Sequence, residues 1–232
     1  MSRRIPELTI DLSCLGTPSA VITPSTRDEY IQALEAYYPE IVSLLNILNP
    51  PLKILFNDLD GTVTNTAGGE VGSAYALVAP DHPFIGEEQP VEIGPDHPLF
   101  EGHFDQLQEF YHNLASNGVL VIPVTQNYGR VTRLIMEQLV GVSCPGWYAS
   151  SLSSPSATGP PQLISKVQFM TAVCSYLENP ACCLFIDDNY DEINWARETP
   201  DLPETFQSRH VRPWLGVNSE LRGEINDFFG LN

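Results

Sequence analysis

The chain has 232 residues with a formal net charge of −18, and 43% of its residues are hydrophobic. This length and composition suit one folded domain with appendages and exclude a wholly disordered chain. The negative balance argues against a nucleic-acid partner, and the lack of any run of about 18 apolar residues argues against a transmembrane segment.

The first fifty residues are predicted to form a largely helical extension. Thr26 and Glu29 have the spacing of a capping box, which opens a helix. Pro39 ends or kinks that helix, and a second short helix follows over 40–48. An Asn-Pro-Pro sequence then closes the segment. We therefore divide the chain into two parts: an extension, 1–50, and a main domain, 51–232.

Strand and helix signals alternate through the main domain. Apolar runs predict four buried strands and a weaker fifth, at 54–57, 119–125, 147–150, 182–187 and 210–217. Amphipathic helices are predicted at 104–117, 131–140, 166–177 and 221–229. Strands that alternate with helices form a parallel sheet covered on both faces. We therefore expect a Rossmann-like three-layer α/β/α fold with a central parallel sheet of about five strands.

Residues 65–99 interrupt this alternation. The segment is rich in glycine and proline, and it is too long for an ordinary connection between two elements. We expect it to form a flap or a small lid.

Aspartates follow two of the predicted strands. Asp58 and Asp60 come directly after the first strand, and Asp187 and Asp188 end the fourth. Because ligands in parallel sheets bind beyond the carboxyl ends of the strands, these carboxylates are expected to converge there, with Asp191 nearby. Carboxylates so close together repel one another unless a cation lies between them, and Mg²⁺ prefers oxygen ligands of this kind.

Further polar residues are expected at the same edge. Thr125 ends the second strand and offers a hydroxyl group. Lys166 lies in the first turn of a helix, where a cation opposes the helix dipole by about 0.3–1 kcal/mol unless an anion is close. Gly61 permits a sharp turn after Asp60 and lets a bound anion approach the backbone. The order of these residues points to a single functional site.

These motifs resemble those of the haloacid dehalogenase-like (HAD) phosphatases. The sequence ILFNDLDGTVT is similar to the first family motif, Thr125 to the second, Lys166 to the third, and CLFIDD with Asp191 to the fourth. The resemblance covers about 52–217. Asn57 departs from it, because family members usually have a large apolar residue before the nucleophile; we expect Asn57 to bond to the flap or to the N-terminal region.

The resemblance implies hydrolysis of a phosphomonoester through an aspartyl-phosphate. Asp58 would attack phosphorus, and Asp60 would protonate the leaving oxygen and then activate water. The phosphoryl oxygens would be held by four residues: Thr125, Lys166, Gly61 and Thr62.

The resemblance also implies a Mg²⁺ ion. Asp58, the backbone carbonyl of Asp60, and Asp187 would hold the ion. Asp188 and Asp191 would act on it directly or through water.

The substrate stays open at this point. No cap domain fits between Thr125 and Lys166, and 65–99 allows only a small lid, so the site is expected to be open. Open family members often act on phosphoproteins, which favours a phosphotyrosine or phosphoserine substrate. Two alternatives remain: a small metabolite such as a sugar phosphate or nucleotide, and a non-catalytic HAD-like scaffold that binds partners.

The five cysteines show neither a CxxC pair nor the spacing of zinc ligands, and none is followed by arginine six positions later. The second absence excludes the loop of cysteine-nucleophile phosphatases. Reduced thiols in a cytoplasmic protein are expected, since Glu7 and Asp11 also interrupt any apolar signal segment.

Lysine is scarce, with Lys53 and Lys166 among eleven basic residues. Lys166 falls at the proposed phosphate site, whereas Lys53 merely precedes a predicted strand.

Overall fold

The computed structural model describes the chain in separate stretches: 24–48, 52–64, 104–125, 134–139, 148–149, 165–177, 182–212 and 216–231. The predicted flap at 65–99 and the first 23 residues of the predicted extension lie outside the described residues.

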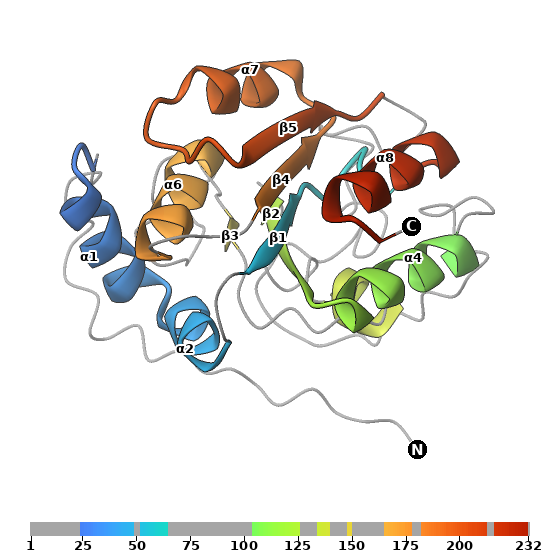
Figure 1. Ribbon diagram of the computed structural model, residues 1–232, viewed down its shortest axis with the longest axis horizontal. Helices are drawn as coiled ribbons and strands as arrows, with labels where there is room; N and C mark the ends of the chain where they lie inside the picture. The colour runs from blue at the N-terminus through green and yellow to red at the C-terminus, as the bar shows by residue number, and fades with distance from the viewer. Residues whose placement is uncertain are drawn as a thin grey trace, which may run out of the picture.

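A five-stranded parallel sheet forms the centre of the described structure (Figure 1). Its order is β3-β2-β1-β4-β5, and every neighbouring pair is parallel. The strands are β1 (Lys53–Asn57), β2 (Val119–Thr125), β3 (Tyr148–Ala149), β4 (Cys182–Asp187) and β5 (Phe206–His210). The predicted α/β class is therefore confirmed. The chain extends the sheet to one side of β1 through β2 and β3 and to the other through β4 and β5. The strand order thus reverses between β1 and β4, which is where such sheets bind ligands.

Four helices cover one face of the sheet: α1 (Arg27–Tyr37), α2 (Pro39–Ile47), α6 (Lys166–Tyr176) and α7 (Tyr190–Glu198). Ile54 and Phe56 of β1 point to this face and pack in one hydrophobic cluster with buried residues of all four helices. Figure 1 shows α1, α2 and α6 grouped on the same side of β1. Because α1 and α2 supply residues such as Leu34 and Ile41 to this cluster, they share the core of the main domain.

The opposite face is covered by α4 (Phe104–Ser116), α8 (Ser219–Phe229) and a π-helical turn, η2 (Leu134–Leu139). Leu55 of β1, with Leu184 and Ile186 of β4, packs against them. The alternation of side chains along each buried strand explains why neighbouring residues belong to different clusters.

Within the described stretches, no helix has both the length and the apolar character that crossing a membrane requires.

Several helix ends form where the sequence predicts them. Thr26 and Glu29 make the expected capping box, in which the Thr26 hydroxyl accepts a hydrogen bond from the Glu29 backbone N–H at 3.3 Å. Pro39 is the first residue of α2, where its missing N–H costs nothing. Ser165 caps α6 by accepting from the Gln168 backbone N–H at 3.1 Å.

The prediction of the fifth strand was wrong in position. The strand expected at 210–217 lies at Phe206–His210 instead. Its residues are largely polar and only partly buried, because β5 is an edge strand that β4 holds through the backbone ladder from Cys183↔Phe206 to Asp187↔His210. The apolar run that suggested 210–217 contains Pro213, which lacks a backbone N–H for such a ladder.

Two helical segments also differ from the prediction. The helix expected at 131–140 is described only over η2, and there the backbone is π-helical. No helix was predicted after β4, where α7 lies. Its signals were present in the sequence, because Asn189 is a residue type that often caps helices and Arg197 is a cation in the last turn. In the structure, Asn189 caps α7 by accepting a hydrogen bond from the Asp191 backbone N–H at 3.0 Å.

Candidate active site

The site begins where β1 and β4 end side by side. Asn57 of β1 is level with Ile186 of β4, and the Asp58 backbone N–H donates to the Ile186 carbonyl at 3.0 Å. The ladder therefore carries one residue beyond β1 and brings Asp58 beside Asp187. Phe56 and Phe185 pack in the same cluster as α6. Because side chains two residues apart on a strand point to the same face, Asp58 and Asp187 also point toward α6.

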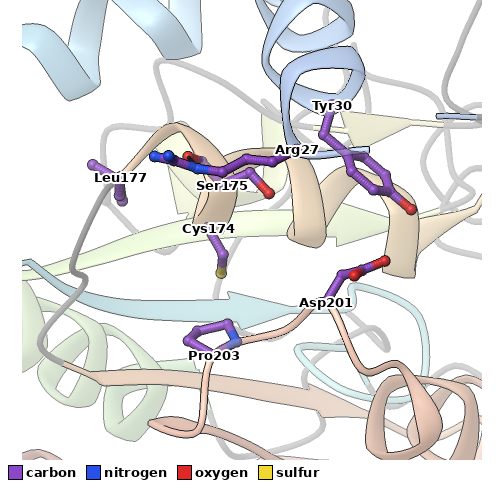
Figure 2. A pocket seen from close by; sticks show the side chains of 7 residues that line it. All are labelled: Arg27, Tyr30, Cys174, Ser175, Leu177, Asp201 and Pro203. Carbon is purple, nitrogen blue, oxygen red and sulfur yellow. Dashed lines mark hydrogen bonds between the residues drawn. The ribbon is translucent and has the colours of Figure 1, made fainter. Parts of the chain in front are cut away.

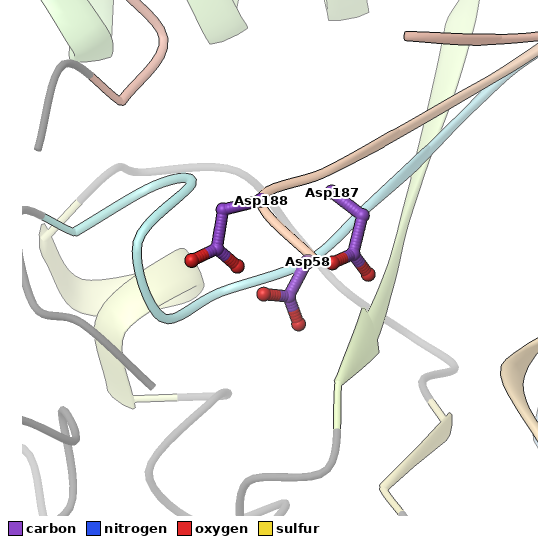
Figure 3. Close-up of side chains that lie close together, drawn as sticks. All are labelled: Asp58, Asp187 and Asp188. Atoms are coloured by element: carbon purple, nitrogen blue, oxygen red, sulfur yellow. The ribbon is translucent and has the colours of Figure 1, made fainter. Parts of the chain in front are cut away.

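Three carboxyl groups gather at this point. One oxygen each from Asp58, Asp187 and Asp188 lies within 4.8 Å of the other two. Figure 3 shows the three side chains extending from the ends of β1 and β4 into one space. Asp58 and Asp187 are buried, and Asp188 is partly exposed. Hence the aspartates that the sequence placed after two different strands do come together in space.

Lys166 supplies a positive charge between two of these carboxylates. Its ammonium group donates to Asp58 Oδ1 at 2.8 Å and to Asp187 Oδ2 at 2.6 Å. The lysine side chain is only 5% exposed. Ser165 starts α6 immediately before this residue, so the helix cap sets where the lysine leaves the helix. The other Asp187 oxygen accepts the Asn189 backbone N–H at 2.7 Å.

The positive charge of Lys166 does not balance the charges of the three carboxyl groups. Burial lowers the pKa of Lys166, but the charges of Asp58 and Asp187 outweigh it, so the pKa is raised and the lysine stays protonated. Burial and then the charge of Asp58 raise the pKa of Asp187 well above its usual range, although Lys166 opposes this. Burial likewise raises the pKa of Asp188 to about 6, with Asp58 as the next cause. One ammonium among three carboxylates leaves an excess of negative charge, which a further cation would relieve.

The turn after β1 carries three more predicted residues. Asp60 is buried, and its charge contributes to the raised pKa of Asp188, so it lies close to the carboxylate group without belonging to it. Gly61 has a φ of 73°, a conformation that side chains other than glycine rarely adopt. The Thr62 hydroxyl is buried and has no hydrogen-bond partner in the described part of the chain.

The remaining predicted residues take different positions. Thr125 is the buried last residue of β2, on the strand next to β1 and at the same edge of the sheet. Asp191 lies in the first turn of α7 and is exposed. Its carboxylate is not part of the three-carboxylate group.

One feature of the site was missed by the sequence analysis. Glu192 of α7 is only 3% exposed, and Oε2 has no hydrogen-bond partner among the described residues. Burial raises its pKa, Lys166 lowers it and Asp58 raises it, so the glutamate feels the charges of the site. If α7 had been predicted, its helical periodicity would have placed Glu192 on the buried face with Ile193 and Ala196. Asn57 is fully buried and donates to the Asp58 carbonyl at 3.1 Å. The flap and the first 23 residues, to which a bond from Asn57 was expected, lie outside the described residues.

Comparisons with known proteins give little beyond this geometry. No protein-family model matches the chain, and no curated protein matches it. Among solved structures, two crystal structures of the Legionella pneumophila effector Ceg4 are similar. The one with an N-terminal TEV protease cleavage sequence has 16% identity and a TM-score of 0.47, and covers 78% of this chain and 96% of Ceg4. The one with an N-terminal yeast Hog1p sequence has 17% identity, a TM-score of 0.41 and coverages of 78% and 97%. Similarity at this level says nothing about activity.

Proposed function

We propose that the chain is a Mg²⁺-dependent phosphomonoester hydrolase of the HAD type that forms an aspartyl-phosphate on Asp58. The observation that carries the proposal is the buried pairing of Lys166 with Asp58 and Asp187 beside a third carboxylate, Asp188. A nucleophilic carboxylate, a cation for the phosphoryl oxygens and a ligand set for a metal are thus contiguous.

The donor set suits Mg²⁺. Asp58, Asp187 and Asp188 offer hard oxygen ligands within 4.8 Å of one another, and the backbone carbonyl of Asp60 is a fourth candidate. A bound ion would offset the negative charge of these carboxylates and of a phosphoryl group. The partial exposure of Asp188 leaves that side of the group open to solvent.

The first chemical step is assigned to the two aspartates around Leu59. An oxygen of Asp58 bonds to phosphorus while the bond between phosphorus and the ester oxygen breaks. Protonated Asp60 gives its proton to the leaving oxygen, so the alcohol departs neutral. Lys166 already lies 2.8 Å from Asp58 Oδ1, so a phosphoryl group on Asp58 would come within reach of its ammonium.

The second step returns the enzyme to its starting state. Asp60, now ionised, takes a proton from water as the water oxygen attacks phosphorus. The bond between phosphorus and Asp58 breaks, and inorganic phosphate leaves. Thr125, at the end of the neighbouring strand, is proposed as a further donor to the phosphoryl oxygens.

We assign a phosphoprotein as the favoured substrate class, because the sequence between Thr125 and Lys166 leaves no room for a cap domain that would enclose a small substrate. A sugar phosphate or nucleotide is the second candidate. The three described cysteines are all unpaired, which favours a reducing compartment such as the cytoplasm.

A chromogenic aryl phosphate tests the chemistry independently of the natural substrate. We expect Mg²⁺-dependent hydrolysis, lowered at least about a hundredfold in Asp58→Asn. Asp227→Asn makes the same change in an exposed aspartate of α8, outside the carboxylate group, and should retain activity. Inactivity of the unaltered protein with every divalent metal tried would contradict the proposal and favour a non-catalytic scaffold. Phosphopeptides compared with a metabolite panel then decide the substrate class.

A further inference from the structure

A groove lies along α6, beside α1 and α7. It consists of two hollows, of about 290 and 430 Å³, that share Tyr30 as a common wall. The first lies between the start of α1, the end of α6 and the segment before β5, with Asp201 on one side (Figure 2). The second lies between the start of α6 and the end of α7.

The second hollow has an exposed aromatic wall. Trp195 lines it and is 54% exposed, whereas tryptophan side chains in folded proteins are on average highly buried. Glu198 supplies the charge in its described lining, and the remaining side chains there are neutral. An exposed indole beside a carboxylate is the combination that binds a lysine or arginine side chain, because the aromatic face and the carboxylate both attract a cation.

The first hollow adds a second carboxylate, that of Asp201. Burial and then the charge of Asp201 raise the pKa of Tyr30, which lines both hollows. Arg27 is the cation lining the first hollow, and its Nε–H already donates to the Ser175 carbonyl at 3.1 Å. With Glu198, the described lining of the groove has two carboxylates and one arginine, together with apolar surface.

We propose that this groove binds an extended, basic peptide segment of a partner protein, with a lysine or arginine side chain against Trp195 and Glu198. A segment of alternating cationic and apolar residues complements both features of the groove. The two exposed acids of the lining, Asp201 and Glu198, would also disfavour acidic segments through repulsion.

A segment bound in the groove would lie next to the candidate active site. Ser165 lines the second hollow, and the next residue, Lys166, reaches the carboxylate group. If the chain is the phosphatase proposed above, protein substrates with lysine or arginine near the phosphorylated residue would be preferred; this consequence rests on the proposed function, whereas the binding itself does not.

Fluorescence anisotropy with labelled, unphosphorylated decapeptides tests the binding directly. One peptide alternates arginine and leucine, and the other alternates glutamate and leucine. We expect the basic peptide alone to bind, and Trp195→Ala and Glu198→Lys each to weaken it about tenfold. Two control variants remove another exposed hydrophobic side chain and repeat the charge reversal elsewhere on the surface: Ile47→Ala and Glu220→Lys. Ile47 is 77% exposed on α2, and Glu220 is exposed on α8.

The charge-matched control separates the groove from general attraction to an acidic protein. If Glu220→Lys weakens the basic peptide as much as Glu198→Lys does, the attraction is not local and the proposal is overturned. Equal binding of the acidic peptide would also overturn it. So would a concentration-dependent dimer that Trp195→Ala abolishes, since the groove would then belong to a second copy of the chain. These readouts need no hydrolysis, so an inactive protein would refute the phosphatase proposal without deciding this one.

Discussion

Replacing Lys166 by methionine removes the ammonium group that lies between Asp58 and Asp187 and leaves a side chain of similar length. In the absence of a metal ion, the carboxylates then remain buried with no opposite charge at 2.6 and 2.8 Å. Loss of one partner from a buried ion pair costs about 3–5 kcal/mol. For a chain of this size each kcal/mol lowers Tm by roughly 2–4 °C, so we expect a decrease of about 6–20 °C in the presence of a chelator.

Added Mg²⁺ should reverse much of this loss. With the lysine gone, the carboxylates carry more uncompensated charge, and a divalent cation that binds there gains more than it does in the unaltered protein. We therefore expect the rise in Tm on adding Mg²⁺ to be larger for Lys166→Met than for the unaltered protein. Differential scanning fluorimetry over a Mg²⁺ titration measures both quantities, and calorimetric titration gives the affinities.

The other lysine of the chain provides the control. Lys53 donates to the Phe229 carbonyl at the end of α8, at 2.7 Å and far from the carboxylates in the fold. Lys53→Met should destabilise the protein by about 1.5–3 kcal/mol, as expected for a hydrogen bond from a charged group, and Mg²⁺ should not restore it. If Lys166→Met is as stable as the unaltered protein with chelator, or if Mg²⁺ stabilises all three proteins equally, the electrostatic account of the site is wrong.

Three further predictions follow from single residues. Gly61→Ala and Gly118→Ala should each lower the unfolding free energy by about 1–2 kcal/mol in urea, because both glycines have positive φ, yet only the first should also reduce phosphatase activity. Glu192→Gln should stabilise the metal-free protein above about pH 5, because burial raises the folded-state pKa of this glutamate and so disfavours its charged form in the fold. The gain in unfolding free energy should vanish as the pH falls below the pKa of the glutamate in the unfolded state. Ser165→Ala and Thr26→Ala should each cost about 1 kcal/mol by removing a helix cap, but only Ser165→Ala, in the helix that presents the lysine, should lower kcat/KM.

Much of the fold could be predicted because its signals are local. The capping box at Thr26, the cap at Ser165 and the apolar runs of β1, β2 and β4 each depend on residues close in the sequence. The edge strand β5 escaped prediction because β4 holds it through backbone hydrogen bonds, which leave little pattern in the side chains. Helix α7 did have local signals, and its omission also concealed the buried Glu192.

The sequence alone determined the length and charge of the chain and the alternation of strands and helices. It also determined that aspartates follow two of the strands. The tertiary structure decided that β1 and β4 are neighbours, so that Asp58 and Asp187 lie side by side. It also decided that Lys166, which is 108 residues from Asp58 along the chain, donates to both of them. The physical reason is that strand order and helix placement depend on how the two faces of the whole sheet are buried, and no local pattern specifies that arrangement.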